Sequence, residues 1–263
     1  MFGMMLLMFV GGIGLTQAVS DPQQVTLRWL RLGGIIALSL LAVTATMHLG
    51  DPSSLTPDTS FILTCITGCF VVQLITVQLA LRFTQRVAAG CGFLTATLLV
   101  TMVMQRIVDS QAQLKHCICP PPMALGMSAA LSGAVLGGYL MAMLLGHAFL
   151  TAGNEMTQRP LRRLVLILGI ALALRAADSL VFGLRPYLAS PAIVTSNVWN
   201  IAMVLARYTL GIAAPAVFTY LIYDCVKRAA NQSATGILYV TLVLVILGEG
   251  ISLALFKATA MVF

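Results

Sequence analysis

Charged residues are scarce in this sequence, and their scarcity excludes a water-soluble fold. Only 9% of the 263 residues are charged and 59% are hydrophobic, whereas a soluble domain has about 25% charged residues. A helix crosses a bilayer with about 20 apolar residues, and the chain has room for about eight such helices. We therefore expect an all-α integral membrane protein with about eight transmembrane helices.

The motifs of soluble enzymes are also missing. The sequence has no Walker A loop, no GxGxxG after a strand and no HExxH, which argues against ATP-driven or independent hydrolytic chemistry. No polar stretch is long enough for a soluble catalytic domain, so any such module must come from another subunit. The net charge of +7 does not indicate nucleic-acid binding, because the basic residues stand at the ends of apolar runs.

Apolar runs and the basic residues between them predict a topology. The expected spans are Phe2–Ala18, Leu32–Leu49, Phe61–Leu81, Val87–Met104, Ala124–Thr151, Leu164–Leu184, Val198–Tyr223 and Thr235–Phe256. Alternate connections are basic, and they carry Arg28, Arg31, Arg82, Arg86, Arg159, Arg162, Arg163, Lys227 and Arg228. The positive-inside rule places these connections in the cytoplasm and both termini on the outer, periplasmic side. Short loops suit a bacterial inner membrane.

A weak internal similarity predicts two tandem four-helix units in parallel orientation, residues 1–120 and 121–263. A shift of 135 residues sets Gly11 on Gly146 and Arg28 on Arg163, and a shift of 142 sets Arg86 on Arg228. Parallel repeats of this kind occur among transporters, and also among quinone-reactive electron-transfer anchors.

Four ionisable residues interrupt the apolar runs of the second unit: Arg175, Asp178, Arg207 and Glu249. A charge at mid-membrane costs roughly 2.5–3.5 kcal/mol on insertion scales, so each needs a partner or a function. Counting residues from the span ends places all four at similar depth, and Arg175 and Asp178 share one helix face. Their counterparts in the first unit are Leu40, Val43, Val72 and Gln105. The first unit is therefore expected to be a scaffold and the second the working unit.

Two readings of these charges are open, a structural salt-bridge network and a functional site. In the functional reading, Glu249 and Asp178 are candidates for proton transfer. Arg207, Tyr208, Arg175 and His48 are candidates for binding a quinone or another polar head group. Pro215 is expected to kink its span just inward of Arg207, which favours a site over a plain strut.

Metal and haem sites receive less support. His48 and His147 are expected near opposite faces of the membrane, so they cannot share one haem iron, and no haem is predicted. The segment containing His116, Cys117 and Cys119 lacks a complete four-ligand set, and no metal site is predicted, although copper or zinc binding there stays open.

The leading hypothesis is a membrane-embedded subunit of an electron-transfer complex that contributes a quinone-binding or proton-conducting site. Four plus four helices with almost no extramembrane mass resemble the anchor subunits of DMSO- and polysulfide-reductase-type complexes. This resemblance concerns the architecture alone, so it assigns no functional role to any residue of this chain. It implies the bilayer and other subunits as partners, quinone as the possible cofactor, and at most a quinone-reactive role in an oxidoreductase.

Two alternatives are kept open. A small proton-coupled secondary transporter or permease would use the same charges to couple proton movement to a solute, although its site residues are often contributed by both halves. A structural or assembly subunit would use the charges only to hold helices together.

Overall fold

The computed structural model describes the chain apart from residues 22–23, 50–56, 113–119, 153–157 and 190–197. Within the described residues, helices are the only regular structure. They are α1 (Phe2–Val19), α2 (Leu27–Leu49), α3 (Pro57–Gln78), α4 (Arg82–Ala112), α5 (Pro122–Ala152), α6 (Arg159–Ser179), η3 (Leu180–Leu184), α7 (Arg185–Leu188), α9 (Val198–Tyr208), η4 (Thr209–Ala213), α10 (Ala214–Lys227) and α11 (Asn231–Thr259).

Eight helical runs in this part of the chain are long and apolar enough to cross a membrane. Several helices begin or end beyond the predicted spans, because backbone hydrogen bonding continues past the apolar residues; α4, for example, begins at Arg82 and ends at Ala112. Large apolar side chains are exposed on the outside of the bundle, including Leu94, Ile170 and Val217. These features suggest an integral membrane protein in contact with lipid.

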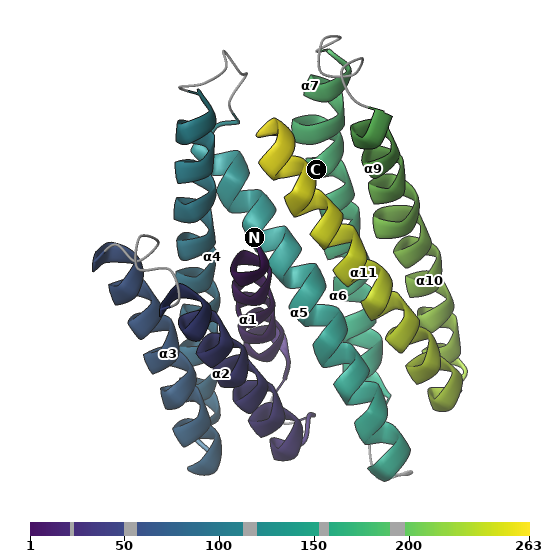
Figure 1. Ribbon diagram of the computed structural model, residues 1–263. Coiled ribbons are helices and arrows are strands. Elements are labelled where there is room, and N and C mark those ends of the chain that lie inside the picture. Colours follow the sequence, from purple (N-terminus) through teal and green to yellow (C-terminus); the bar gives the residue numbers. More distant parts are fainter. Residues whose placement is uncertain (22–23, 50–56, 113–119, 153–157, 190–197) are drawn as a thin grey trace.

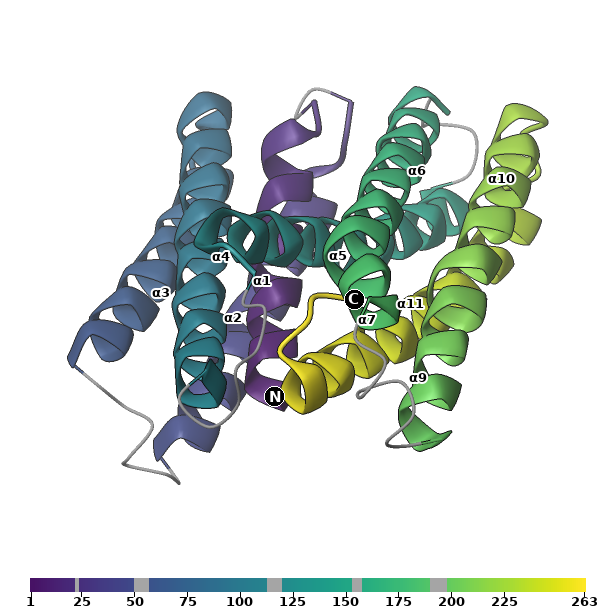
Figure 2. The same ribbon diagram turned by 90° about the horizontal axis from the view of Figure 1, so that it is seen from above.

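The helices form two groups of four that lie side by side (Figures 1 and 2). In the first group, α1 contacts α2 and α4, and α3 contacts the same two helices. In the second, α5 contacts α6 and α11, and α10 contacts the same two helices. The two groups thus have the same order of neighbours, and the predicted boundary at residues 120–121 falls between α4 and α5. The duplication itself stays a prediction.

Helices α1 and α5 lie in the middle and join the two groups. Glycines permit this contact, because a Cβ atom built on Gly12 would lie 1.8 Å from the carbonyl oxygen of Gly133, and one on Gly137 would lie 2.3 Å from the amide nitrogen of Ile13. Small residues of α5 therefore allow a close contact between helices inside the bundle.

Two π-helical segments interrupt the helices of the second group. The amide of Arg185 donates to the carbonyl of Leu180, and the amide of Ala214 donates to the carbonyl of Thr209, each five residues back. A proline follows both segments, Pro186 and Pro215. Because proline has no N–H and its ring clashes with the preceding turn, the chain adopts a wider turn at these points. Sequence analysis predicted a distortion only at Pro215.

The last residues fold back into the second group. Helix α11 ends at Thr259, and Ala260 adopts a left-handed conformation with φ of 58°. The four residues Ala260–Phe263, called the tail below, are all buried. The ring of Phe263 packs edge-to-face on Tyr187, with 5.7 Å between the ring centroids. In Figure 2 the tail runs from the end of α11 toward α6 and α7.

Candidate functional site

Arg175, in the last turns of α6, is the centre of a buried polar cluster. Its Nη1 atom lies 3.0 Å from Oδ2 of Asp178, one turn further along the same helix. Its Nη2 atom lies 3.2 Å from Oε2 of Glu249 and donates to the hydroxyl of Ser252 at 2.9 Å, both on α11. The side chain is only 2% exposed. Arg175 therefore joins α6 to α11 in the interior of the second group.

Glu249 accepts hydrogen bonds from three helices. Besides Arg175, the Nη2 atom of Arg207 on α9 donates to Oε1 at 2.9 Å, and the hydroxyl of Ser132 on α5 donates to Oε2 at 2.8 Å. A charge removed from water needs such partners, because unpaired burial costs several kcal/mol. Both carboxylate oxygens are thus occupied by protein donors.

A close helix crossing brings Arg207 to Glu249. A Cβ atom on Gly248 would lie 2.4 Å from Cα of Gly211, and one on Gly211 would lie 2.7 Å from Cα of Gly248. The two glycines therefore allow η4 and α11 to touch through their backbones, and the side chain of Arg207 runs beside this contact. Arg207 has no exposed surface.

The four charged side chains of the cluster balance, since two arginines face two carboxylates. Its hydrogen bonding is nevertheless incomplete. Nε and Nη1 of Arg207 and Nε of Arg175 are buried without a partner among the described residues. Buried polar atoms of this kind are uncommon and call for an explanation, such as a function or an unseen water. The cluster can therefore accept further hydrogen-bonding groups.

The tail covers the cluster. The main-chain oxygen of Phe263 accepts hydrogen bonds from both Arg175 and Ser252. Tyr187, Val204, Leu255, Met261 and Phe263 form a small apolar cluster around this point. A main-chain oxygen in apolar surroundings is thus held by an arginine and a serine.

The contacts confirm the prediction that the four charged side chains meet, whereas their roles in proton transfer or binding stay predictions. Tyr208 lies beside the cluster, and its hydroxyl donates to the main-chain oxygen of Ser179 at 2.9 Å instead of contacting a charged residue. His48 is in the last turns of α2, in the first group of helices, and its side chain lies outside the described part of the structure.

Sequence reasoning missed three members of the site: Ser132, Ser252 and the main-chain oxygen of Phe263. The spacing of Glu249 and Ser252, three residues apart on one helix, was a usable signal because such residues share a face. No sequence pattern indicated that the tail folds back.

Among the described residues, no three side chains of His, Cys, Asp or Glu lie close enough together to bind one metal ion. His116, Cys117 and Cys119 lie outside the described residues. His147 is exposed near the end of α5. No protein-family model, no curated protein and no solved structure matches this chain.

Proposed function

We propose that the chain is a membrane subunit of an electron-transfer complex that holds a quinone head group against the cluster of Arg175, Asp178, Arg207 and Glu249. The membrane would be a bacterial inner membrane, with both termini on the outer side. Eight apolar helices support insertion. The connections richest in arginine and lysine lie at the lower end of the bundle in Figure 1, and the marks for both termini lie above that end, which supports the orientation.

The observation that carries this proposal is the binding of the main-chain oxygen of Phe263 by Arg175 and Ser252. A quinone carbonyl is likewise an oxygen acceptor, and it needs an apolar space beside it for its ring. The side-chain ring of Phe263, packed on Tyr187, fills an apolar space of this kind near the bound oxygen. In this proposal the tail moves aside and a quinone oxygen takes the place of the main-chain oxygen.

Reduction of a quinone consumes two electrons and two protons. The electrons would come from a redox group of a partner subunit. Glu249 and Asp178 would pass protons to the quinone oxygen, with Arg175 hydrogen-bonded to both carboxylates. The free donors of Arg207 would stabilise negative charge that develops on the ring oxygens. The first group of helices would serve as scaffold, as it contributes no charged residue to the cluster.

Isolation of the protein from native membranes with its partners and lipids tests this function. Redox subunits and bound quinone in the purified complex are expected. A Ser252→Ala variant should weaken quinone binding by roughly 2- to 10-fold, because one hydrogen bond is worth about 0.5–1.5 kcal/mol. Thr241→Ala is the control, since the hydroxyl of Thr241, also on α11, donates to the main-chain oxygen of Ile237 in its own helix. Solute transport by the protein alone in liposomes, without quinone, would instead support the transporter alternative.

A further inference from the structure

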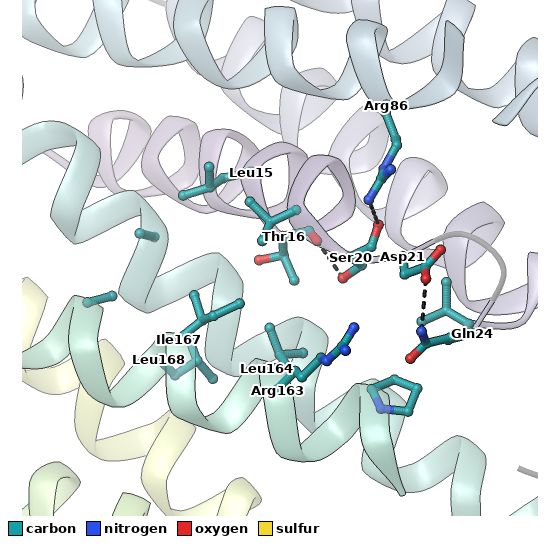
Figure 3. Close-up of a pocket in the computed structure, with 15 residues that line it drawn as sticks. Leu15, Thr16, Ser20, Asp21, Gln24, Arg86, Arg163, Leu164, Ile167 and Leu168 are labelled. Atoms are coloured by element: carbon teal, nitrogen blue, oxygen red, sulfur yellow. Dashed lines mark hydrogen bonds between the residues drawn. The ribbon is translucent and has the colours of Figure 1, made fainter. Parts of the chain in front are cut away.

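A cavity of about 350 Å³ opens between the two groups of helices, at the end of the bundle that carries the basic connections (Figure 3). Ends of α1, α4 and α6 surround it, and Ala134 of α5 lies at its inner side. Its size falls within the range of small-molecule sites, about 300–1,000 Å³. It is separate from the charged cluster and shares no residue with it.

Two arginines stand at the mouth of this cavity, one from each group of helices. Arg86 of α4 donates from Nη2 to the main-chain oxygen of Ser20 at 3.0 Å, while its Nε atom is buried without a partner among the described residues. Arg163 of α6 is exposed, and its guanidinium points toward the same mouth in Figure 3. Asp21 is the carboxylate among the lining residues and accepts a hydrogen bond from Gln24 at 2.9 Å. The lining therefore carries a net positive charge.

The deeper wall is apolar and opens sideways. It is formed by Leu15, Val19, Leu164, Ile167, Leu168 and Ala171. Val19 is 49% exposed and Ile167 40% exposed, so the cavity opens onto the outer apolar surface of the bundle. A positive mouth above an apolar slot matches a molecule with an anionic head and a hydrocarbon chain.

We propose that this cavity binds one anionic phospholipid, with the phosphate between Arg86 and Arg163 and one acyl chain along the apolar wall. The inference rests on membrane insertion as proposed above, and not on quinone binding. Basic pockets between transmembrane helices on the cytoplasmic side are suited to such head groups. Because the two arginines belong to different groups of helices, the bound lipid would also bridge the two groups.

Lipid titration of the delipidated protein in a neutral detergent tests the site, with bound lipid counted by native mass spectrometry. Phosphatidylglycerol should bind more tightly than phosphatidylcholine. Each of Arg86→Gln and Arg163→Gln should weaken phosphatidylglycerol binding by about fivefold, and the double variant by about 25-fold, given the usual contribution of a basic residue near lipid head groups. Arg162→Gln is the matched control, because Arg162 is directed to Tyr223, whose hydroxyl it meets at 3.0 Å.

The proposal is overturned if Arg162→Gln weakens binding as much as the double variant, since diffuse surface charge would then explain the affinity. Equal binding of phosphatidylcholine, or binding of glycerol phosphate as tightly as the lipid, would also overturn it. Ile167→Trp keeps both arginines and fills the apolar wall, so it should lower phosphatidylglycerol binding even where an arginine variant folds poorly. Quinone binding in the Arg86→Gln/Arg163→Gln variant should be unchanged, which separates failure of this site from failure of the quinone site.

Discussion

Arg207 and Glu249 form an ion pair of 2.9 Å between α9 and α11, and the arginine side chain has no exposed surface. The pair sits directly beside the contact between Gly211 and Gly248. Its geometry is therefore coupled to the packing of two helix backbones, and a change in either should disturb the other.

Replacing Glu249 by Gln should destabilise the fold strongly. The variant leaves Arg175 and Arg207 buried without a charged partner apart from Asp178, and breaking a buried pair costs about 3–5 kcal/mol. Unfolding of the purified protein in mixed detergent micelles measures the loss. Asp224→Asn is the control, because Asp224 pairs with Arg228 at 2.9 Å near the surface and should cost less than about 1 kcal/mol.

The double variant Arg207→Met/Glu249→Met tests whether the stability contributed by one side chain of the pair depends on the other. It removes one positive and one negative charge together, so it should be more stable than Glu249→Gln alone. A double variant that is as unstable as the sum of its single variants would show that the two side chains act independently. That result would contradict a coupled network.

Two glycines on either side of Glu249 should respond oppositely to substitution. Gly248→Ala forces a Cβ atom to within 2.4 Å of the Gly211 backbone and should cost about 1–3 kcal/mol or more. A Cβ atom on Gly250 meets nothing within 4 Å, so Gly250→Ala should leave stability unchanged or raise it, because alanine favours helix. Thermal unfolding of both variants makes the comparison, and equal losses would contradict the described crossing.

The contact between the two groups of helices should be equally sensitive to the replacement of a glycine. Gly12→Ala places a Cβ atom 1.8 Å from the carbonyl oxygen of Gly133, a distance at which α1 and α5 must separate. We expect a lower unfolding temperature and weaker resistance to proteolysis. Gly68→Ala in α3 is the control, since its Cβ atom would meet nothing within 4 Å. A stable Gly12→Ala protein would show that the two groups do not meet at this point.

Removal of the tail should expose the cluster. Ser252 is buried beneath the main-chain oxygen of Phe263, so a cysteine at that position should react slowly with a water-soluble maleimide in the full chain. Deletion of residues 260–263 should accelerate labelling of Ser252→Cys by at least about tenfold, because opening to solvent governs the reaction. The six native cysteines, among them the exposed Cys91 of α4, should be replaced beforehand so that only the introduced thiol can react. Unchanged labelling would mean that the tail does not shield the cluster.

The sequence was sufficient to predict the eight apolar helices and the meeting of four charges. Apolar runs of membrane-spanning length are unambiguous, and charges at similar depth in neighbouring spans have few other places to find partners. Helix ends were less predictable, because Arg82 begins α4 and Ala112 ends it although both lie outside the apolar run. Backbone hydrogen bonds, not hydropathy, decide where a helix ends.

The two serines, the tail and the glycine contact of the site could not be predicted, because their contacts depend on tertiary packing. Ser132 and Ser252 are small residues whose hydroxyls are equally suited to bonding their own helix, so their bonds to Glu249 and Phe263 depend on tertiary packing. The same applies to the tail, because its burial is set by an apolar space between helices that no local pattern reveals. The close approach of Gly211 to Gly248 likewise depends on the crossing of two distant segments.

The π-helical segments η3 and η4 have a consequence for how the second group should be mutated. Successive residues of an α-helix are about 100° apart around its axis, and each wide turn in effect inserts one extra residue. The lipid-facing stripe of α6 therefore does not continue in phase beyond Leu184, nor that of α9 beyond Ala213. A scanning experiment that assumes one periodicity from residue 159 to 188, or from 198 to 227, would assign inward and outward positions wrongly after each wide turn, in residues 185–188 of the first span and 214–227 of the second.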